Sequence, residues 1–180
     1  GAGCGKTTQI KRLKLLLEHD GWPVQAVSSG NMFRALAMIA RLFMIDSPER
    51  ASEISPDDLI RIALDYHLGF REEQAAFAAN LIPNGFLRDP ETVVLVGHVS
   101  MLPEVREYVT LRVQDAVSEF NGISLIDGRD GGTVVFPDAP LKLWMTVSDE
   151  EAAERTGVDI EVIRARNELD RNRGIAPMIP

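Results

Sequence analysis

The sequence predicts an α/β fold of three layers, in which helices cover both faces of a central parallel sheet. A glycine-rich loop opens the chain and is followed by a helical pattern, and two short apolar strands are expected at 123–126 and 141–147. Short connections between such strands, with helices around them, are typical of a parallel sheet. In sheets of this kind, ligands bind beyond the carboxyl ends of the strands.

The composition indicates one soluble globular domain. The chain has 180 residues, of which 45% are hydrophobic and 26% charged, and single domains usually have about 100–200 residues. The formal net charge of −8 argues against a broad surface for nucleic acid. The single cysteine cannot form an internal disulfide, and no apolar run approaches the ~18 residues that span a membrane. We therefore expect a cytoplasmic monomer with no nucleic-acid or membrane partner.

The first eight residues, G-A-G-C-G-K-T-T, fit the end of the phosphate-binding pattern G-x-x-x-x-G-K-[ST]. Small residues let backbone N–H groups converge on phosphate oxygens, and the following helix adds its positive end. Lys6 is expected to reach the β- and γ-phosphates and the Thr7 hydroxyl to bind Mg²⁺. The alternative is a simple strand-to-helix turn, but the helical pattern of 9–20 favours nucleotide binding. The predicted loop consists of Gly1, Ala2, Gly3, Cys4, Gly5, Lys6, Thr7 and Thr8.

The rest of the chain is expected to alternate between helices and short strands. The predicted helices are 9–20, 31–45, one starting at Pro56, and 103–120, and the predicted strands are 21–27, 92–96, 123–126 and 141–147. Ser55 is the expected N-cap of the helix that starts at Pro56. Residues 67–88 lose the helical period, and the turn signal at 83–85 favours short strands or a hairpin within an insert.

Two charged segments are candidates for chemistry. Residues 127–130 contain two aspartates directly after a strand, where a parallel sheet places its ligands, although a solvated turn would also favour these residue types. Four arginines lie between 164 and 173. A charge run alone is usually a solvated face, but guanidinium groups beside a phosphate-binding loop suit phosphoryl transfer.

Three blocks of the sequence together resemble bacterial-type cytidylate kinases, a family of P-loop nucleoside monophosphate kinases. They are S-G-N-M-F-R-A-L at 29–36, I-D-G-R-D-G-G-T-V-V-F-P-D-A at 126–139 and D-R-N-R-G-I-A-P at 170–177, and P-E-V-R-E at 103–107 is also similar. The resemblance implies a P-loop CORE domain (1–30 and 103–148), an NMP-binding insert (31–102) and a short LID with the arginine-rich segment (149–180).

The resemblance also implies an activity, which is transfer of the γ-phosphoryl group of MgATP to CMP or dCMP in pyrimidine metabolism. ATP is then the co-substrate, Thr7 binds Mg²⁺, and Asp127 assists through a water. The implied catalytic residues are Lys6, Arg129, Arg155 and Arg173. The implied substrate-binding residues are Ser29, Phe33, Arg34, Arg106, Arg129, Asp130, Arg166, Asp170 and Arg173.

The implied substrate contacts divide among the parts of CMP. Its phosphate would be held by Arg34, Arg129 and Arg173. The cytosine edge would be read by Arg106 and Asp130, since a carboxylate can accept from the exocyclic amino group that uracil lacks. The ribose would be held by Arg166 with Asp170, and Arg155 matches a LID arginine that reaches the ATP phosphates.

Some positions depart from the family pattern and leave two alternatives open. Phe33 stands where the family usually has Tyr, Gly97 stands near a Ser that helps read cytosine, and the segment 150–166 is shorter than the family's LID. The run G-K-T-T-Q at 5–9 is closer to thymidylate kinases. One alternative is therefore a kinase for UMP or dTMP, and the other is a nucleotide-binding protein without catalytic activity.

Overall fold

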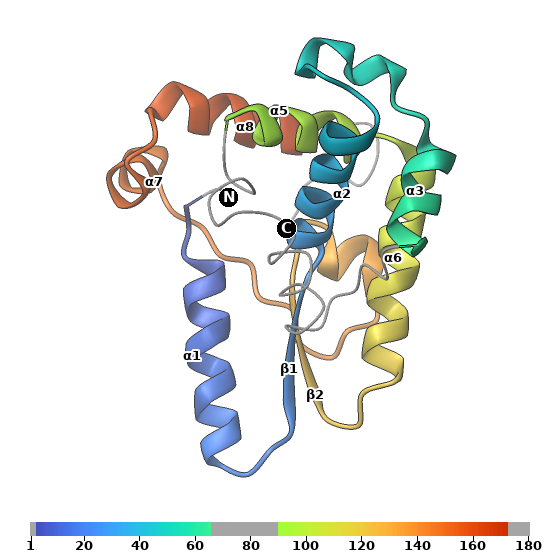
Figure 1. The fold of residues 1–180 in the computed structure, drawn as a ribbon. Helices are drawn as coiled ribbons and strands as arrows, with labels where there is room; N and C mark the ends of the chain where they lie inside the picture. The colour runs from blue at the N-terminus through green and yellow to red at the C-terminus, as the bar shows by residue number, and fades with distance from the viewer. Residues whose placement is uncertain (1–2, 66–89, 173–180) are drawn as a thin grey trace. The chain divides into compact units, whose positions relative to one another are not determined.

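The computed structural model of this chain describes residues 3–65 and 90–172 (Figure 1). They belong to two compact units, one built from residues up to 26 together with those from 120 onward, and one built from residues 27–119. The boundaries expected for a CORE, an insert and a LID stay a prediction.

The first unit starts with the glycine-rich loop and helix α1 (Lys6–His19). Gly5, in the left-handed region at φ 83°, precedes the helix, and its carbonyl accepts the first helical bond from Gln9 N at 3.0 Å. The chain leaves the helix at Gly21, which also has a positive φ of 85°. The predicted helix is therefore confirmed, and it begins earlier than expected because Lys6 is itself its first residue.

Strands β1 (Val24–Ser28) and β2 (Ile123–Asp127) pair as a parallel two-stranded sheet (Figure 1). Ile123 N donates to Pro23 O at 2.9 Å, and Gln25 Nε2 donates to Ser124 Oγ at 2.8 Å. Helix α1 packs on β2. Both strands were predicted, and the parallel sheet is confirmed.

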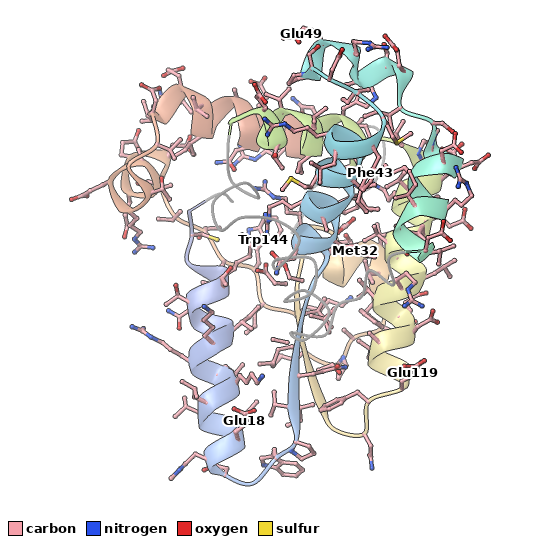
Figure 2. The ribbon with its side chains drawn as sticks, viewed as in Figure 1. Glu18, Met32, Phe43, Glu49, Glu119 and Trp144 are labelled. Carbon is pink, nitrogen blue, oxygen red and sulfur yellow. The ribbon has the colours of Figure 1, made fainter. Side chains whose placement is uncertain are left out.

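The predicted strand 141–147 is wrong for the described part of the chain. Residues 141–147 run without secondary structure and pair with neither β1 nor β2. Their apolar side chains are largely open to solvent, with Leu141 and Leu143 each 73% exposed and Trp144 46% exposed (Figure 2). A strand exists only when a neighbour accepts and donates its backbone hydrogen bonds, and no described segment does so here.

Two helices, α7 (Asp149–Thr156) and α8 (Ile160–Asn172), pack against each other in the first unit. Ser148 caps α7 by accepting a hydrogen bond at Oγ from Glu151 N, at 3.1 Å. Asp159 accepts at Oδ1 from Glu161 N, at 2.8 Å, at the start of α8. Gly157, with a φ of 67°, ends α7.

The second unit is helical in its described part. It contains α2 (Ser29–Phe43), the 3₁₀ turn η1 (Pro48–Glu53), α3 (Pro56–Asp65), α5 (Pro90–Val99) and α6 (Pro103–Ser118). Helix α2 packs on α3, α5 and α6, and it buries every residue from 36 to 40. The C-terminal end of α2 is exposed to solvent, since Met32 near its start is 3% exposed and Phe43 at its end is 54% exposed (Figure 2).

The prediction of a strand at 92–96 is wrong, because these residues lie within helix α5. Three of its side chains, Thr92, Leu95 and Val99, are fully buried, and their spacing of three and four is that of one helical face. The β-branched composition favours a strand only weakly. Packing on α2 and the ion pair between Arg41 and Glu91 therefore outweigh it.

The predicted N-cap of α3 is confirmed, since Ser55 Oγ accepts from Asp58 N at 3.3 Å. The predicted helices 31–45 and 103–120 are also confirmed as α2 and α6. The hairpin expected within 67–88 lies outside the described residues. In the described part of the chain, no helix is long and apolar enough to cross a membrane.

Candidate nucleotide-binding site

The glycine-rich loop has the backbone that a phosphate-binding loop needs. Gly3 and Gly5 both lie in the left-handed region, at φ 68° and 83°, which L side chains adopt at a cost. Cys4 between them is only 4% exposed. The two glycines therefore form the turn that directly precedes α1. Gly1 and Ala2, the other predicted loop residues, lie outside the described residues.

Lys6 and Cys4 lie in contact at the start of α1. Lys6 Nζ donates to Cys4 Sγ at 3.4 Å. Burial raises the pKa of the Cys4 thiol, but nearby positive charges, that of Lys6 first, outweigh burial, so the pKa lies below its ordinary value. The ammonium group of Lys6 is therefore directed back toward the glycine-rich loop.

Thr7 and Asp127 connect the loop to the end of strand β2. Thr7 Oγ1 donates to Asp127 Oδ2 at 3.2 Å across 120 positions of the chain. Because Asp127 is the last residue of β2, this bond places a hydroxyl and a carboxylate together at the carboxyl end of a parallel strand. The sequence analysis expected both residues near a magnesium ion, and the structure brings their side chains together.

Asp130 lies directly beyond β2 and is buried. It is 5% exposed, and its carbonyl accepts from the backbone N–H groups of Thr133, Val134 and Val135 at 3.2, 2.9 and 3.2 Å. These bonds form the wide helical turn η3 (Gly131–Val135). A turn does follow β2, but Asp130 within it is buried and not solvated as the alternative interpretation of this cluster assumed, and the turn fixes the backbone of Asp130, next to the half-buried Arg129.

In the second unit, the structure joins two of the predicted substrate residues, Phe33 of α2 and Arg106 of α6. The Arg106 guanidinium carbon lies 5.2 Å from the centroid of the Phe33 ring, and the two side chains are 5% and 7% exposed. Arg106 Nε and Nη2 both donate to the Ser100 carbonyl, at 3.0 and 2.8 Å. The guanidinium is therefore held on one edge by a backbone oxygen and on one face by a ring.

The other predicted substrate residues of this unit lie at the start of α2. Ser29 is 6% exposed and is the first residue of the helix. One turn later, Arg34 Nη2 donates to Asn31 Oδ1. Arg34 is half-buried, and its guanidinium is positioned by this contact within one helical turn.

Two arginines of α7 and α8 form ion pairs with acidic side chains in the described part of the chain. Arg155 forms an ion pair with Glu151. Arg164 pairs with Glu161 at 2.8 Å and Glu150 at 3.1 Å. Arg164 thus belongs to a solvated charged face, as a charge run often does. The side chains of Arg166 and Asp170, and Arg173 as a whole, lie outside the described residues.

Two contacts of the candidate site had no signal in the sequence. The Ser100 carbonyl that holds Arg106 is a backbone group, and such groups leave no mark in a residue pattern. The second contact is that of α7 with the glycine-rich loop, through the small residues Ala152 and Thr156. Residues of these types are common in helices, so their presence in the sequence does not indicate a contact.

A glycine-rich loop that ends in G-K-T and leads into a helix, beside the carboxyl end of a parallel strand, is the arrangement of P-loop proteins. The family model described as "Cytidylate kinase" matches residues 1–180. The cytidylate kinase of Colwellia psychrerythraea is 33% identical over 197 residues, covering 99% of this chain and 81% of that protein. The cytidylate kinase of Escherichia coli K12 is 33% identical over 195 residues, covering 99% and 80%. The chain belongs to the cytidylate kinase family.

Proposed function

We propose that this protein transfers the γ-phosphoryl group of ATP to CMP or dCMP, giving ADP and CDP or dCDP. A phosphate oxygen of the monophosphate attacks the γ-phosphorus, and the bond to the β–γ bridging oxygen breaks. The observation that carries the proposal is the Thr7–Asp127 hydrogen bond of 3.2 Å, since it joins the phosphate-binding loop to the strand end where such enzymes position their phosphates. Membership of the cytidylate kinase family supports the choice of substrates.

The glycine-rich loop and Lys6 would bind the ATP phosphates. Backbone N–H groups of the loop and the positive end of α1 favour negative charge at this place. Lys6 would exchange its contact with Cys4 Sγ for the β- and γ-phosphates. The attacking phosphate is already an anion, so alignment and charge neutralisation lower the barrier, and no general base is needed.

The residues at the Thr7–Asp127 contact fit a magnesium ion. Mg²⁺ is usually bound by one or two protein oxygens together with substrate phosphates and waters, and a hydroxyl with one carboxylate is such a set. Among the described residues no group of three or more His, Cys, Asp or Glu could hold a metal by itself. When bound, Mg²⁺ neutralises phosphate charge. Thr7 would ligate it directly, and Asp127 through a water.

The phosphate of CMP would be bound by arginines. We assign this role to Arg34, Arg129 and Arg173, because guanidinium groups can bind phosphate oxygens with two parallel hydrogen bonds. Arg34 is half-buried and fixed by Asn31, which lowers the entropy lost when it binds an anion. Arg155 is paired with Glu151, so it would have to exchange that carboxylate for the phosphates of ATP.

The base and sugar would be bound by other residues of the family pattern. Arg106 and Asp130 are assigned to the cytosine edge, with the Phe33 ring against Arg106 and Ser29 nearby in the chain. Arg166 with Asp170 is assigned to the ribose. A buried carboxylate such as Asp130 suits the amino group of cytosine. In uracil a carbonyl oxygen stands at that position, and its partial negative charge would be repelled by the carboxylate.

We expect only small-molecule nucleotides as partners. The net charge of −8 disfavours nucleic acid, and a cytoplasmic location and a monomeric state stay predictions.

The test is a panel of phosphate acceptors with ATP as donor. We expect turnover with CMP and dCMP to exceed that with UMP, dTMP or AMP, and ATP titration to show saturable binding. Lys6→Ala should lower turnover by about 10²-fold or more in a folded protein, because it removes a charge that acts on the migrating phosphoryl group. Equal turnover by wild type and Lys6→Ala would contradict the proposal.

Two observations favour testing a second activity, phosphorylation of UMP or dTMP, in the same panel. Gly97 offers no side chain where the family has a serine that reads cytosine, and the loop run at 5–9 is similar to that of thymidylate kinases. A preference for UMP or dTMP would identify that related activity. Saturable ATP binding without turnover of any acceptor would identify a non-catalytic nucleotide-binding protein instead.

A further inference from the structure

The glycine-rich loop and helix α7, both in the first unit, approach each other unusually closely at Gly3. A Cβ atom placed on Gly3 would lie 3.0 Å from Ala152 Cβ and 3.1 Å from Thr156 Cγ2. Carbon atoms at van der Waals contact are about 3.5–4.0 Å apart, so a side chain at position 3 would push α7 back by a few tenths of an ångström, and its backbone would also be strained at φ 68°. In Figure 1, α7 lies next to the start of α1, where this loop is found.

The face of α7 that lies against the loop contains two small side chains, Ala152 and Thr156. Ala152 and Thr156 are four positions apart and therefore lie on the same helical face. Ala152 is 1% exposed, and Thr156 Oγ1 donates to the Ala152 carbonyl at 2.7 Å. This bond fixes the threonine rotamer, and with it the place of the methyl group that faces Gly3.

Helix α7 is itself held in place by its neighbours. Asn167 of α8 is 5% exposed, and its Nδ2 donates to Asp149 Oδ1 at 3.0 Å. Ser148 caps the same end of α7. The surface against Gly3 is therefore rigid, since one end of the helix is capped and cross-linked and the contacting side chains have few rotamers.

We propose that Ala152 and Thr156 are positioning residues that hold the Gly3 backbone in the conformation that binds the phosphates of ATP. This inference rests on the proposed role of the loop in binding ATP. A phosphate-binding loop works through N–H groups aimed at fixed points, and sites of this kind need their groups within about 0.5 Å of the productive geometry. Because Gly3 lies close to Ala152 and Thr156, a larger side chain on this face of α7 would displace the loop.

The structure predicts that this displacement acts on ATP binding more than on CMP binding. The contact joins α7 to Gly3, whereas the residues assigned to the cytosine edge, Arg106 and Asp130, lie on α6 and directly after β2. A substitution at position 152 should therefore raise the dissociation constant for ATP much more than that for CMP. A residue that merely stabilised the fold would change both or neither.

The first experiment compares Ala152→Leu with Ala153→Leu, which adds the same bulk at the adjacent position of α7, away from Gly3. Calorimetric titration of the whole protein should show the ATP dissociation constant raised about tenfold or more in Ala152→Leu and within about twofold of wild type in Ala153→Leu. The CMP dissociation constant should stay within about twofold in both. Unaltered ATP binding in Ala152→Leu, or equal weakening in both variants, would overturn the inference.

A second pair of variants tests the inference if Ala152→Leu does not fold. Thr156→Val keeps the methyl group toward Gly3 and loses the hydroxyl, whereas Thr156→Ser keeps the hydroxyl and loses that methyl group. We expect Thr156→Ser to weaken ATP binding about two- to fivefold and Thr156→Val to do so less. The reverse order would overturn the inference. Absence of ATP binding in the wild type would instead contradict the proposed function itself.

Discussion

The ring of Phe33 covers the guanidinium group of Arg106, with 5.2 Å between the ring centroid and the guanidinium carbon. The two residues are 73 positions apart, on α2 and α6 of the same unit, and both are buried. Two donors of Arg106 are directed to the Ser100 carbonyl. The guanidinium therefore has a fixed plane before any substrate arrives, which reduces the entropy that binding must overcome.

Removing the Phe33 ring should weaken the binding of CMP. Phe33→Leu keeps an apolar side chain of similar burial but loses the cation–π contact, which contributes about 0.5–2 kcal/mol. We expect the KM for CMP to rise about three- to tenfold, with the KM for ATP unaltered. Phe33→Tyr is the matched control, because it keeps the ring. Steady-state kinetics with each nucleotide varied in turn measure both constants, and an unaltered CMP KM in Phe33→Leu would refute the role.

The carboxylate of Asp127 should matter through its charge. Asp127→Asn keeps the shape and still offers an oxygen to Thr7 Oγ1, now bonded at 3.2 Å, but it removes the negative charge that attracts Mg²⁺. We expect turnover to fall about 10–10²-fold and the Mg²⁺ concentration for half-maximal activity to rise. Magnesium titration of both proteins measures this shift. An unaltered magnesium requirement would mean that Asp127 only orients Thr7.

Asp130 should determine the choice of base. If its carboxylate accepts from the amino group of cytosine, CMP should be a better substrate than UMP, because UMP would direct a carbonyl oxygen at a buried carboxylate. Asp130→Ala should then lose most of the preference for CMP while turnover of UMP falls little or rises. Measurement of kcat/KM for both substrates in both proteins decides the question. Equal losses for CMP and UMP would assign Asp130 a structural role or one toward the phosphates.

Gly97 should be replaceable at a gain in stability. It is an exposed residue of α5, and a Cβ placed on it meets no atom within 4 Å. Gly97→Ala should raise the free energy of unfolding by about 0.5–1 kcal/mol, because glycine loses more backbone entropy in a helix. Urea denaturation measures this change. A lower stability of Gly97→Ala would show that α5 needs the open space at this position.

Gly97→Ser tests base selection at the same position. The added hydroxyl fits the same space, and we expect it to increase the preference for CMP over UMP, since the resemblance to cytidylate kinases implies a serine that reads cytosine near this position. Gly97→Ala is the control for the backbone effect. The ratio of kcat/KM for CMP and UMP should rise in Gly97→Ser alone, and a rise in Gly97→Ala as well would attribute it to the stiffer helix.

Features that depend on local chemistry could be predicted from the residues alone. The loop before α1, with glycines at positions that adopt positive φ, could be predicted because few other residues tolerate that backbone. The cap of α3 by Ser55 followed from the same kind of local rule. Thr7 and Asp127 were both expected near one magnesium ion, and the direct hydrogen bond between them is seen only in the structure.

Features that depend on packing between segments required the folded structure. Residues 92–96 are helical because α2 covers the face that contains Leu95, and burial on one helical face outweighs the small strand preference of valine. Residues 141–147 form no strand because no described segment supplies the backbone partners that a strand requires. The ring of Phe33 lies over Arg106, and Gly3 lies close to two small side chains of α7. Both contacts join distant parts of the chain, so no local pattern indicates them.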